Sequence, residues 1–86
     1  EWNKTINSER QANLSEALGK PNIPASEILH NLIDGLGMPR NLTTVGVKRE
    51  QFQQLAENCM LDDWTFSNPR KINTPEQVIE ILELAI

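Results

Sequence analysis

Residues 24–36 read PASEILHNLIDGL, and this stretch carries the clearest helical pattern in the chain. Its apolar residues recur at steps of three and four, a spacing that places side chains on one face of an α-helix. They are Ala25, Ile28, Leu29, Leu32, Ile33 and Leu36. Pro24 suits the first turn, where its missing N–H costs nothing. Gly37 is a natural left-handed stop, so we predict an amphipathic helix over about residues 24–36.

Two neighbouring stretches show the same periodicity. Residues 8–18 have only a thin apolar stripe before a Gly-Lys-Pro sequence, which predicts a partly buried helix. Residues 49–61 predict a stronger helix, because five residues of low polarity share one face. They are Phe52, Leu55, Ala56, Cys59 and Met60. This placement makes Cys59 a core residue.

The last stretch, residues 75–84 or later, has the clearest start signal. Thr74 can cap the helix, Pro75 fits its first position and Gln77 completes a capping box. The apolar residues that follow lie on more than one side, as in a helix packed among others.

Extended structure has little support in the chain. There is no Tyr, and only residues 42–47 hold enough Thr and Val to suggest a strand. We therefore predict an all-α fold of about four amphipathic helices that form part of a helical bundle domain. Residues 38–47 and 62–73 mix apolar with turn-forming residues, which favours ordered loops that pack on something.

Size and composition exclude several classes of protein. A chain of 86 residues holds at most one domain. It is too short to contain both a nucleotide-binding domain and a catalytic domain. Hydrophobic residues make up 38% and charged residues 23%, and no apolar run approaches the ~20 residues of a membrane span. The first residues lack the pattern of a secretory signal, which favours the cytoplasm or a chain whose beginning is missing. The net charge of −4 and the scattered basic residues argue against a nucleic-acid partner.

No residue pattern indicates chemistry within the chain itself. His30 is the only histidine and Cys59 the only cysteine, so neither has the partners that a metal site requires. Cys59 also lacks an activating neighbour, and the adjacent carboxylates of Asp62 and Asp63 are expected to end a helix. We predict no catalytic residue and no metal ligand among these residues.

Three short motifs carry a resemblance to a known family. Residues 36–42 read LGMPRNL, residues 45–47 read VGV and residues 68–70 read NPR. In this order and spacing, with the helices between them, they resemble the closing pattern of the iron-containing alcohol dehydrogenases. The resemblance extends from about residue 28 to residue 86, and Trp2 with Asn3 matches an aromatic-Asn pair of many members.

The resemblance implies that residues 1–86 are a C-terminal fragment of the helical, dehydroquinate synthase-like domain of an oxidoreductase. The parent enzyme would interconvert alcohols with aldehydes or ketones, using NAD(P) and Fe²⁺ or another divalent metal. In the family one Asp and three His hold the metal, all of them before this segment. The fragment alone would bind neither cofactor and would be inactive. Its partners would be the remainder of the parent chain and a small alcohol or aldehyde; a homodimeric, cytoplasmic parent is also expected.

The resemblance also gives expected roles to single residues. The segment before the Asn-Pro-Arg motif borders the substrate and nicotinamide pocket in the family, so Trp64 and Phe66 are candidate pocket residues. Plugging the space between helices is an alternative role for both. A structural role is expected for the motif residues. These are Pro39, Gly46, Asn68, Pro69 and Arg70.

Two other functions stay open at this stage. The maleylacetate reductases belong to the same family, and their acidic substrate would require extra cationic groups. From a different class, an acidic helical chain of this length could be a stand-alone protein-interaction module. An acyl carrier is disfavoured, because no serine stands in the context that accepts a phosphopantetheine arm.

Overall fold

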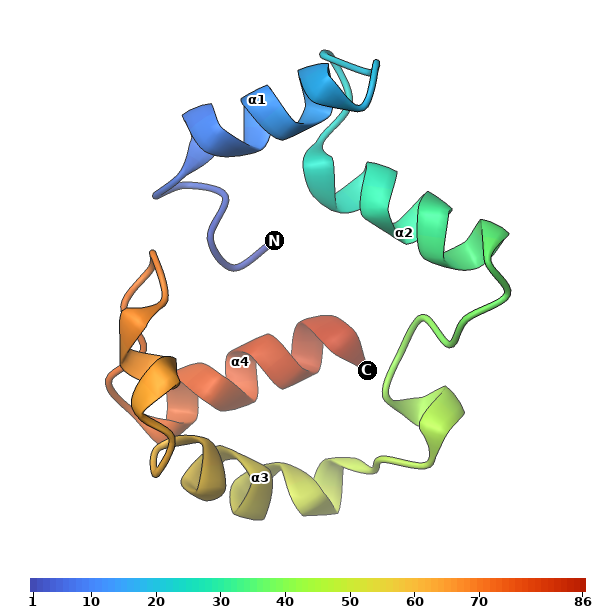
Figure 1. Ribbon diagram of the computed structural model, residues 1–86. Helices are drawn as coiled ribbons and strands as arrows, with labels where there is room; N and C mark the ends of the chain where they lie inside the picture. Colours follow the sequence, from blue (N-terminus) through green and yellow to red (C-terminus); the bar gives the residue numbers. More distant parts are fainter. The chain divides into compact units, whose positions relative to one another are not determined.

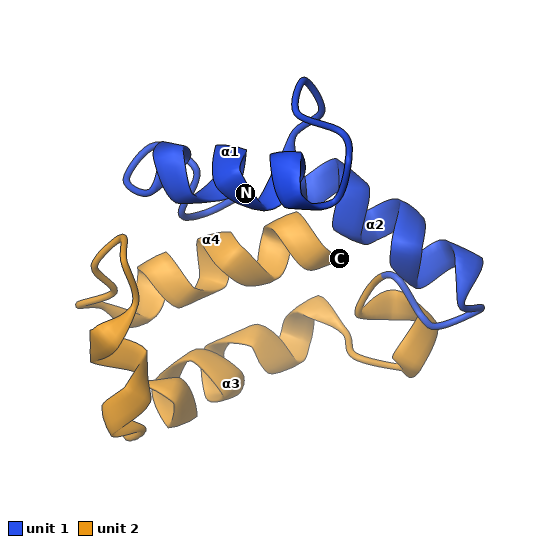
Figure 2. Ribbon diagram, turned by 45° about the horizontal axis from the view of Figure 1, so that its top comes forward, with its two compact units in different colours: residues 1–40 blue, residues 41–86 orange.

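The computed structural model describes all 86 residues and contains helices but no strand (Figure 1). The α-helices are α1 (Ser8–Ala17), α2 (Ala25–Gly35), α3 (Phe52–Cys59) and α4 (Pro75–Ala85). Three short 3₁₀-helices lie between them: η1 (Thr43–Val45), η2 (Arg49–Gln51) and η3 (Asp63–Ser67). The prediction of an all-α fold with four main helices is confirmed. The chain divides into two compact units, residues 1–40 and residues 41–86 (Figure 2).

Unit 1, residues 1–40, holds α1 and α2, which contact each other. Ala25 and Ile28 are buried on α2, whereas Leu32 and Leu36 on the same predicted face are mostly exposed. The helix ends where Gly37 adopts a positive φ of 70° and donates its N–H to the carbonyl of Asp34. The predicted left-handed stop is confirmed, because glycine alone adopts this backbone without strain.

Unit 2, residues 41–86, holds α3 and α4, which lie against each other (Figure 2). Its core contains Phe52 and Ala56 on α3, Val78 on α4 and Ile72 from the loop before α4, all of them buried. Phe52 and Ala56 are one helical turn apart, so the predicted inward face of this helix is confirmed. Leu55, predicted on that face, is exposed.

The start of α4 follows the predicted capping box. The N–H of Gln77 donates to Oγ1 of Thr74 at 3.4 Å, and Oε1 of Gln77 accepts from the N–H of Thr74 at 3.1 Å. Oε1 of Gln77 also accepts from the N–H of Asn73 at 2.7 Å. These bonds satisfy backbone donors that a helix start leaves free, and so fix the first turn.

The segment before α3 holds the end of α4 through what we call the terminal clasp, residues 42–49 with residues 83–86. The N–H of Leu42 donates to the carbonyl of Ala85 at 2.8 Å, and Oγ1 of Thr43 donates to the carbonyl of Ile86 at 3.1 Å. The last carbonyls of a helix have no partner within it. The clasp therefore caps α4 with residues more than forty positions earlier.

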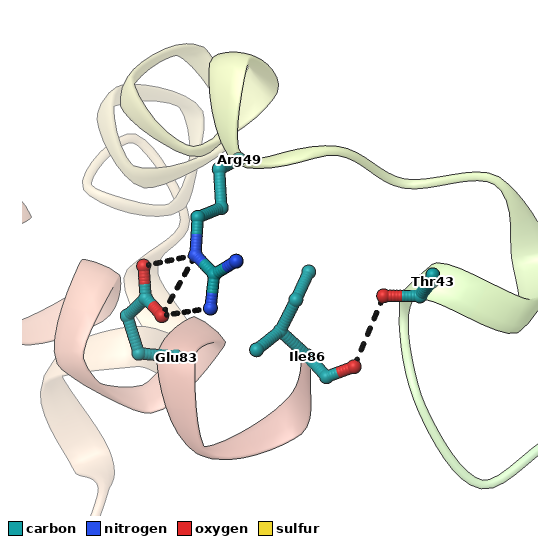
Figure 3. A network of polar contacts seen from close by, with 4 residues as sticks. All are labelled: Thr43, Arg49, Glu83 and Ile86. Carbon is teal, nitrogen blue, oxygen red and sulfur yellow. Dashed lines mark hydrogen bonds and ion pairs between the residues drawn. The ribbon is translucent and has the colours of Figure 1, made fainter.

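An ion pair completes the clasp, as Figure 3 shows. Nε and Nη2 of Arg49 donate to the carboxylate of Glu83 at 3.0–3.1 Å. The hydrogen bonds to Glu83 raise the pKa of Arg49 above its ordinary value. Both side chains are exposed, so the pair positions the two helix ends more than it stabilises the fold.

The extended structure suggested for residues 42–47 is not found. The segment forms η1, and Gly46 follows it with a φ of 86°. Oδ1 of Asn41 accepts from the N–H of Thr44 at 2.9 Å and from its hydroxyl at 2.7 Å. These side-chain hydrogen bonds fold the backbone into a turn and override the preference of Thr and Val for strands.

Two further expectations need correction near the end of α3. Cys59 is half-buried rather than a core residue. Asp62 does not end α3, because this helix stops at Cys59. The carboxylate of Asp62 instead accepts a hydrogen bond from the N–H of Trp64 at 3.0 Å and caps η3. The predicted ordered loop contains this short helix because Asp62 supplies a cap of its own.

Candidate functional site

A pocket of about 510 Å³ opens in unit 2 between the end of α3, η3 and α4. This volume lies in the ordinary range for small-molecule sites. The lining residues are mostly apolar and include no lysine, arginine, histidine, aspartate or glutamate. They are Cys59, Trp64, Thr65, Ser67, Asn68, Pro69, Ile72, Val78, Ile81 and Leu82.

The turn that carries Trp64 is fixed by side-chain hydrogen bonds. Besides the Asp62 cap, Oγ1 of Thr65 donates to the carbonyl of Cys59 at 2.7 Å, and Oγ of Ser67 donates to the carbonyl of Trp64 at 2.8 Å. The indole of Trp64 nevertheless remains 82% exposed at the edge of the pocket. A large aromatic side chain therefore lies at the edge of the pocket on a backbone that is already ordered.

The Asn-Pro-Arg segment forms the next part of the wall. Asn68 has extended backbone, with φ −62° and ψ 141°, and its Nδ2 donates to the carbonyl of Arg70 at 2.7 Å. A residue before proline favours this conformation, because the proline ring clashes with a helical one. Asn68 and Pro69 line the pocket, whereas Arg70 does not.

The other residues named from the sequence lie elsewhere. Phe66 is 45% exposed on η3 but does not line the pocket. Pro39 belongs to unit 1, and Gly46 lies in the turn after η1. The structure therefore brings Trp64, Asn68 and Pro69 together at one pocket and leaves the other candidates outside it.

Ile81 and Leu82 were missed as pocket residues by the sequence analysis. Their periodicity on α4 indicated a helix apolar on several sides, which is the pattern of a packed core. The sequence holds no local signal that distinguishes a pocket wall from a core, because the difference depends on what faces the helix.

A smaller polar pocket of about 230 Å³ lies in unit 1 and includes His30 and Arg40. The nearby carboxylate of Glu1 accepts hydrogen bonds from Lys4 at 2.8 Å and from Ser26 at 2.9 Å. These bonds, led by that of Lys4, lower the pKa of Glu1 to about 2. Most residues that line this pocket are polar or charged, and no cluster of metal ligands is present, so it is the weaker candidate.

Comparison with known proteins identifies the family. The family model described as "Fe-containing alcohol dehydrogenase family, C-terminal" matches residues 1–86, the whole chain. The chain belongs to the Fe-containing alcohol dehydrogenase family. The resemblance inferred from the LGMPRNL, VGV and NPR motifs is thereby confirmed, although nothing points specifically to the maleylacetate reductase branch.

Similar curated proteins are themselves dehydrogenases. The chain is 39% identical over 59 residues to dehydrogenase FUM7 of Gibberella moniliformis, covering 69% of this chain and 14% of that protein. It is 44% identical over 57 residues to alcohol dehydrogenase 4 of Saccharomyces cerevisiae, covering 66% of this chain and 15% of that protein. It is 32% identical over 93 aligned positions to 1,3-propanediol dehydrogenase of Citrobacter freundii, covering 98% of this chain and 24% of that protein.

The chain spans between about one seventh and one quarter of the length of these Fe-containing alcohol dehydrogenase relatives. No solved structure matches it. The comparisons do not favour an interaction module as its function.

The family name implies a metal. No group of three or more His, Cys, Asp or Glu side chains is placed so that it could hold a metal ion. No helix is long and apolar enough to pass through a bilayer.

Proposed function

We propose that this chain is the C-terminal part of the helical domain of an alcohol dehydrogenase that depends on NAD(P) and a divalent metal. The parent enzyme would interconvert alcohols with aldehydes or ketones, in the cytoplasm and as a homodimer. Residues outside this chain would hold Fe²⁺ or another divalent metal and the nicotinamide nucleotide. The chain alone would be inactive.

The observation that carries the proposal is the family match over all 86 residues, together with relatives named alcohol and propanediol dehydrogenases. Many large apolar side chains of the chain are also exposed, among them Leu36 at 68% and Leu61 at 83%. We propose that the remainder of the parent chain covers part of this apolar surface.

Within this function, we assign Trp64 to the wall of the substrate pocket. Its indole stands at the edge of the apolar pocket of unit 2, and its backbone is held by Asp62 and Ser67. We assign a structural role to the motif residues, with Asn68 ordering its own loop through the bond to the Arg70 carbonyl. The structure gives Phe66 no place in that wall.

The function is tested with the full-length protein that contains this chain. We expect it to oxidise NADH or NADPH when aldehydes are supplied, to lose this activity on dialysis against a chelator, and to regain it with Fe²⁺ or Zn²⁺. Maleylacetate serves as the comparison substrate and the 86-residue chain as the inactive control. Absence of reduction for every aldehyde, or full activity after metal removal, would contradict the proposal.

The role of Trp64 is tested by Trp64→Ala in the same full-length protein. Removing the indole should enlarge the pocket and shift the ratio of kcat/KM for benzaldehyde over propanal by about ten-fold, a change typical of a reshaped apolar pocket. The thermal midpoint should change little, because the indole is not part of the core. Phe66→Ala, on the same turn but outside the pocket, is the matched control. An unchanged ratio for Trp64→Ala would reject the assignment.

A further inference from the structure

We infer that the pocket beside Trp64 accepts an uncharged hydrocarbon group, so that the preferred substrates are alcohols and aldehydes with apolar chains and not ones that carry a carboxylate. This inference rests on the proposed function, because it takes the pocket as part of the substrate site. It goes further by naming the substrate class from the lining residues.

The inner wall of the pocket is hydrocarbon. Ile72 and Val78 are 7% and 6% exposed and form its buried side, while Ile81 and Leu82 extend the wall along α4. An apolar group placed there leaves water without losing any hydrogen bond.

The hydroxyl and amide side chains that line the pocket already donate to the backbone, which leaves the indole N–H of Trp64 as a donor at the rim. The hydroxyls of Thr65 and Ser67 donate to the carbonyls of Cys59 and Trp64, and Nδ2 of Asn68 donates to the carbonyl of Arg70. A hydroxyl has one proton to donate, so these two offer only lone pairs to a ligand. No buried side-chain nitrogen or oxygen in the chain lacks a partner. The pocket therefore has few donors for a carboxylate.

The charges around the pocket also disfavour an anion. No lysine, arginine or histidine is among the lining residues, although Arg70 and Lys71 follow Pro69 in the sequence. Asp62 and Asp63 precede Trp64 on the turn that forms the rim. A substrate carboxylate in this pocket would lose its hydration without gaining a cation or a set of donors, which makes the transfer unfavourable.

The volume of about 510 Å³ admits a chain of several carbons beyond the reacting group. Each methylene that enters an apolar site gains roughly a three- to four-fold factor in affinity. Chain length and terminal charge are therefore the two substrate properties that this pocket should distinguish.

The test measures kcat and KM of the full-length enzyme for unbranched aldehydes from propanal to octanal. Each is compared with the aldehyde that carries a carboxylate at the far end, such as succinic semialdehyde. We expect KM to fall by about three-fold per added methylene until the pocket is full. The carboxylate partners should have kcat/KM values about a hundred-fold lower.

The variant Ile81→Phe tests the proposed role of the pocket directly. The larger side chain should fill part of the pocket and move the chain-length optimum to shorter aldehydes. Leu84→Phe, on an exposed position of the same helix, is the matched control. Ile81→Val makes the opposite, milder change and should move the optimum to longer aldehydes. It keeps the inference testable if the phenylalanine variant does not fold. Thermal midpoints are recorded for all three variants.

The outcomes separate the two proposals. If no aldehyde is reduced, the proposed function itself fails. If aldehydes are reduced without dependence on chain length, or if carboxylate substrates compete equally, the function stands and this inference is overturned. It is also overturned if the Ile81 variants change the thermal midpoint but not the substrate profile, because the pocket would then be filled by protein in the complete enzyme.

Discussion

Glu1 is a residue whose lowered pKa the sequence alone did not indicate. Its carboxylate pairs with Lys4, three residues later, and with Ser26, twenty-five residues later. The pKa of Glu1 falls from 4.5 to about 2 because both partners donate to the ionised form, Lys4 most strongly. The Lys4 pair is local, but the Ser26 bond depends on how unit 1 folds.

A pH titration tests this arrangement. A lowered pKa in the folded state means that the contribution of Glu1 to stability is present above about pH 4.5 and is lost as the pH falls toward 2. We expect Lys4→Ala to raise the pKa of Glu1 the most and Ser26→Ala to raise it less, as measured by NMR of the side-chain carboxyl. Lys20→Ala is the control, since Lys20 does not bond to Glu1. A Glu1 carboxyl that titrates near 4.5 in the unmodified chain would show that these bonds do not form.

Single residues also show which local structures can be predicted from the sequence and which cannot. Gly37 and Thr74 were predictable because positive φ and capping depend on one residue and its nearest neighbours. Asp62 was assigned to the wrong helix because it can serve either the end of one helix or the start of the next. Only the position of the N–H of Trp64 decides between these two roles.

Among the elements, α3 shows how periodicity predicts packing. Phe52 and Ala56, 3% and 0% exposed, lie one turn apart on the face toward α4. The pattern could not predict that Arg49–Gln51 winds as a separate 3₁₀-helix, a difference of a single turn at a helix start.

The interface between α3 and α4 gives a stability prediction. Phe52→Ala should lower the free energy of unfolding by about 3–5 kcal/mol, because it removes buried area and leaves a cavity. Gln53→Ala, the next residue and exposed, should change it by no more than about 0.5 kcal/mol. Urea unfolding followed by circular dichroism measures both. Equal losses for the two variants would mean that α3 does not pack as described.

For the molecule as a whole, the fold class and family were predictable from the sequence, whereas of the residues that line the pocket only Trp64 was expected there, from the family resemblance. The helices follow from local spacing, and the family follows from three short motifs in order. The pocket arises because η3 and α4 approach each other, which brings Trp64 to residues such as Ile81 that looked like ordinary core. Such proximity is a property of tertiary structure and leaves no local mark in the sequence.

The terminal clasp has a consequence for engineering. Because Thr43 and Ile86 are joined by a 3.1 Å hydrogen bond, the two ends of residues 41–86 are spatial neighbours. Ends that lie together at the surface are the usual condition for circular permutation. A short glycine-serine linker from Ile86 to Asn41, with new termini opened at the exposed Leu61, would reorder the connectivity and leave the contacts between α3 and α4 in place.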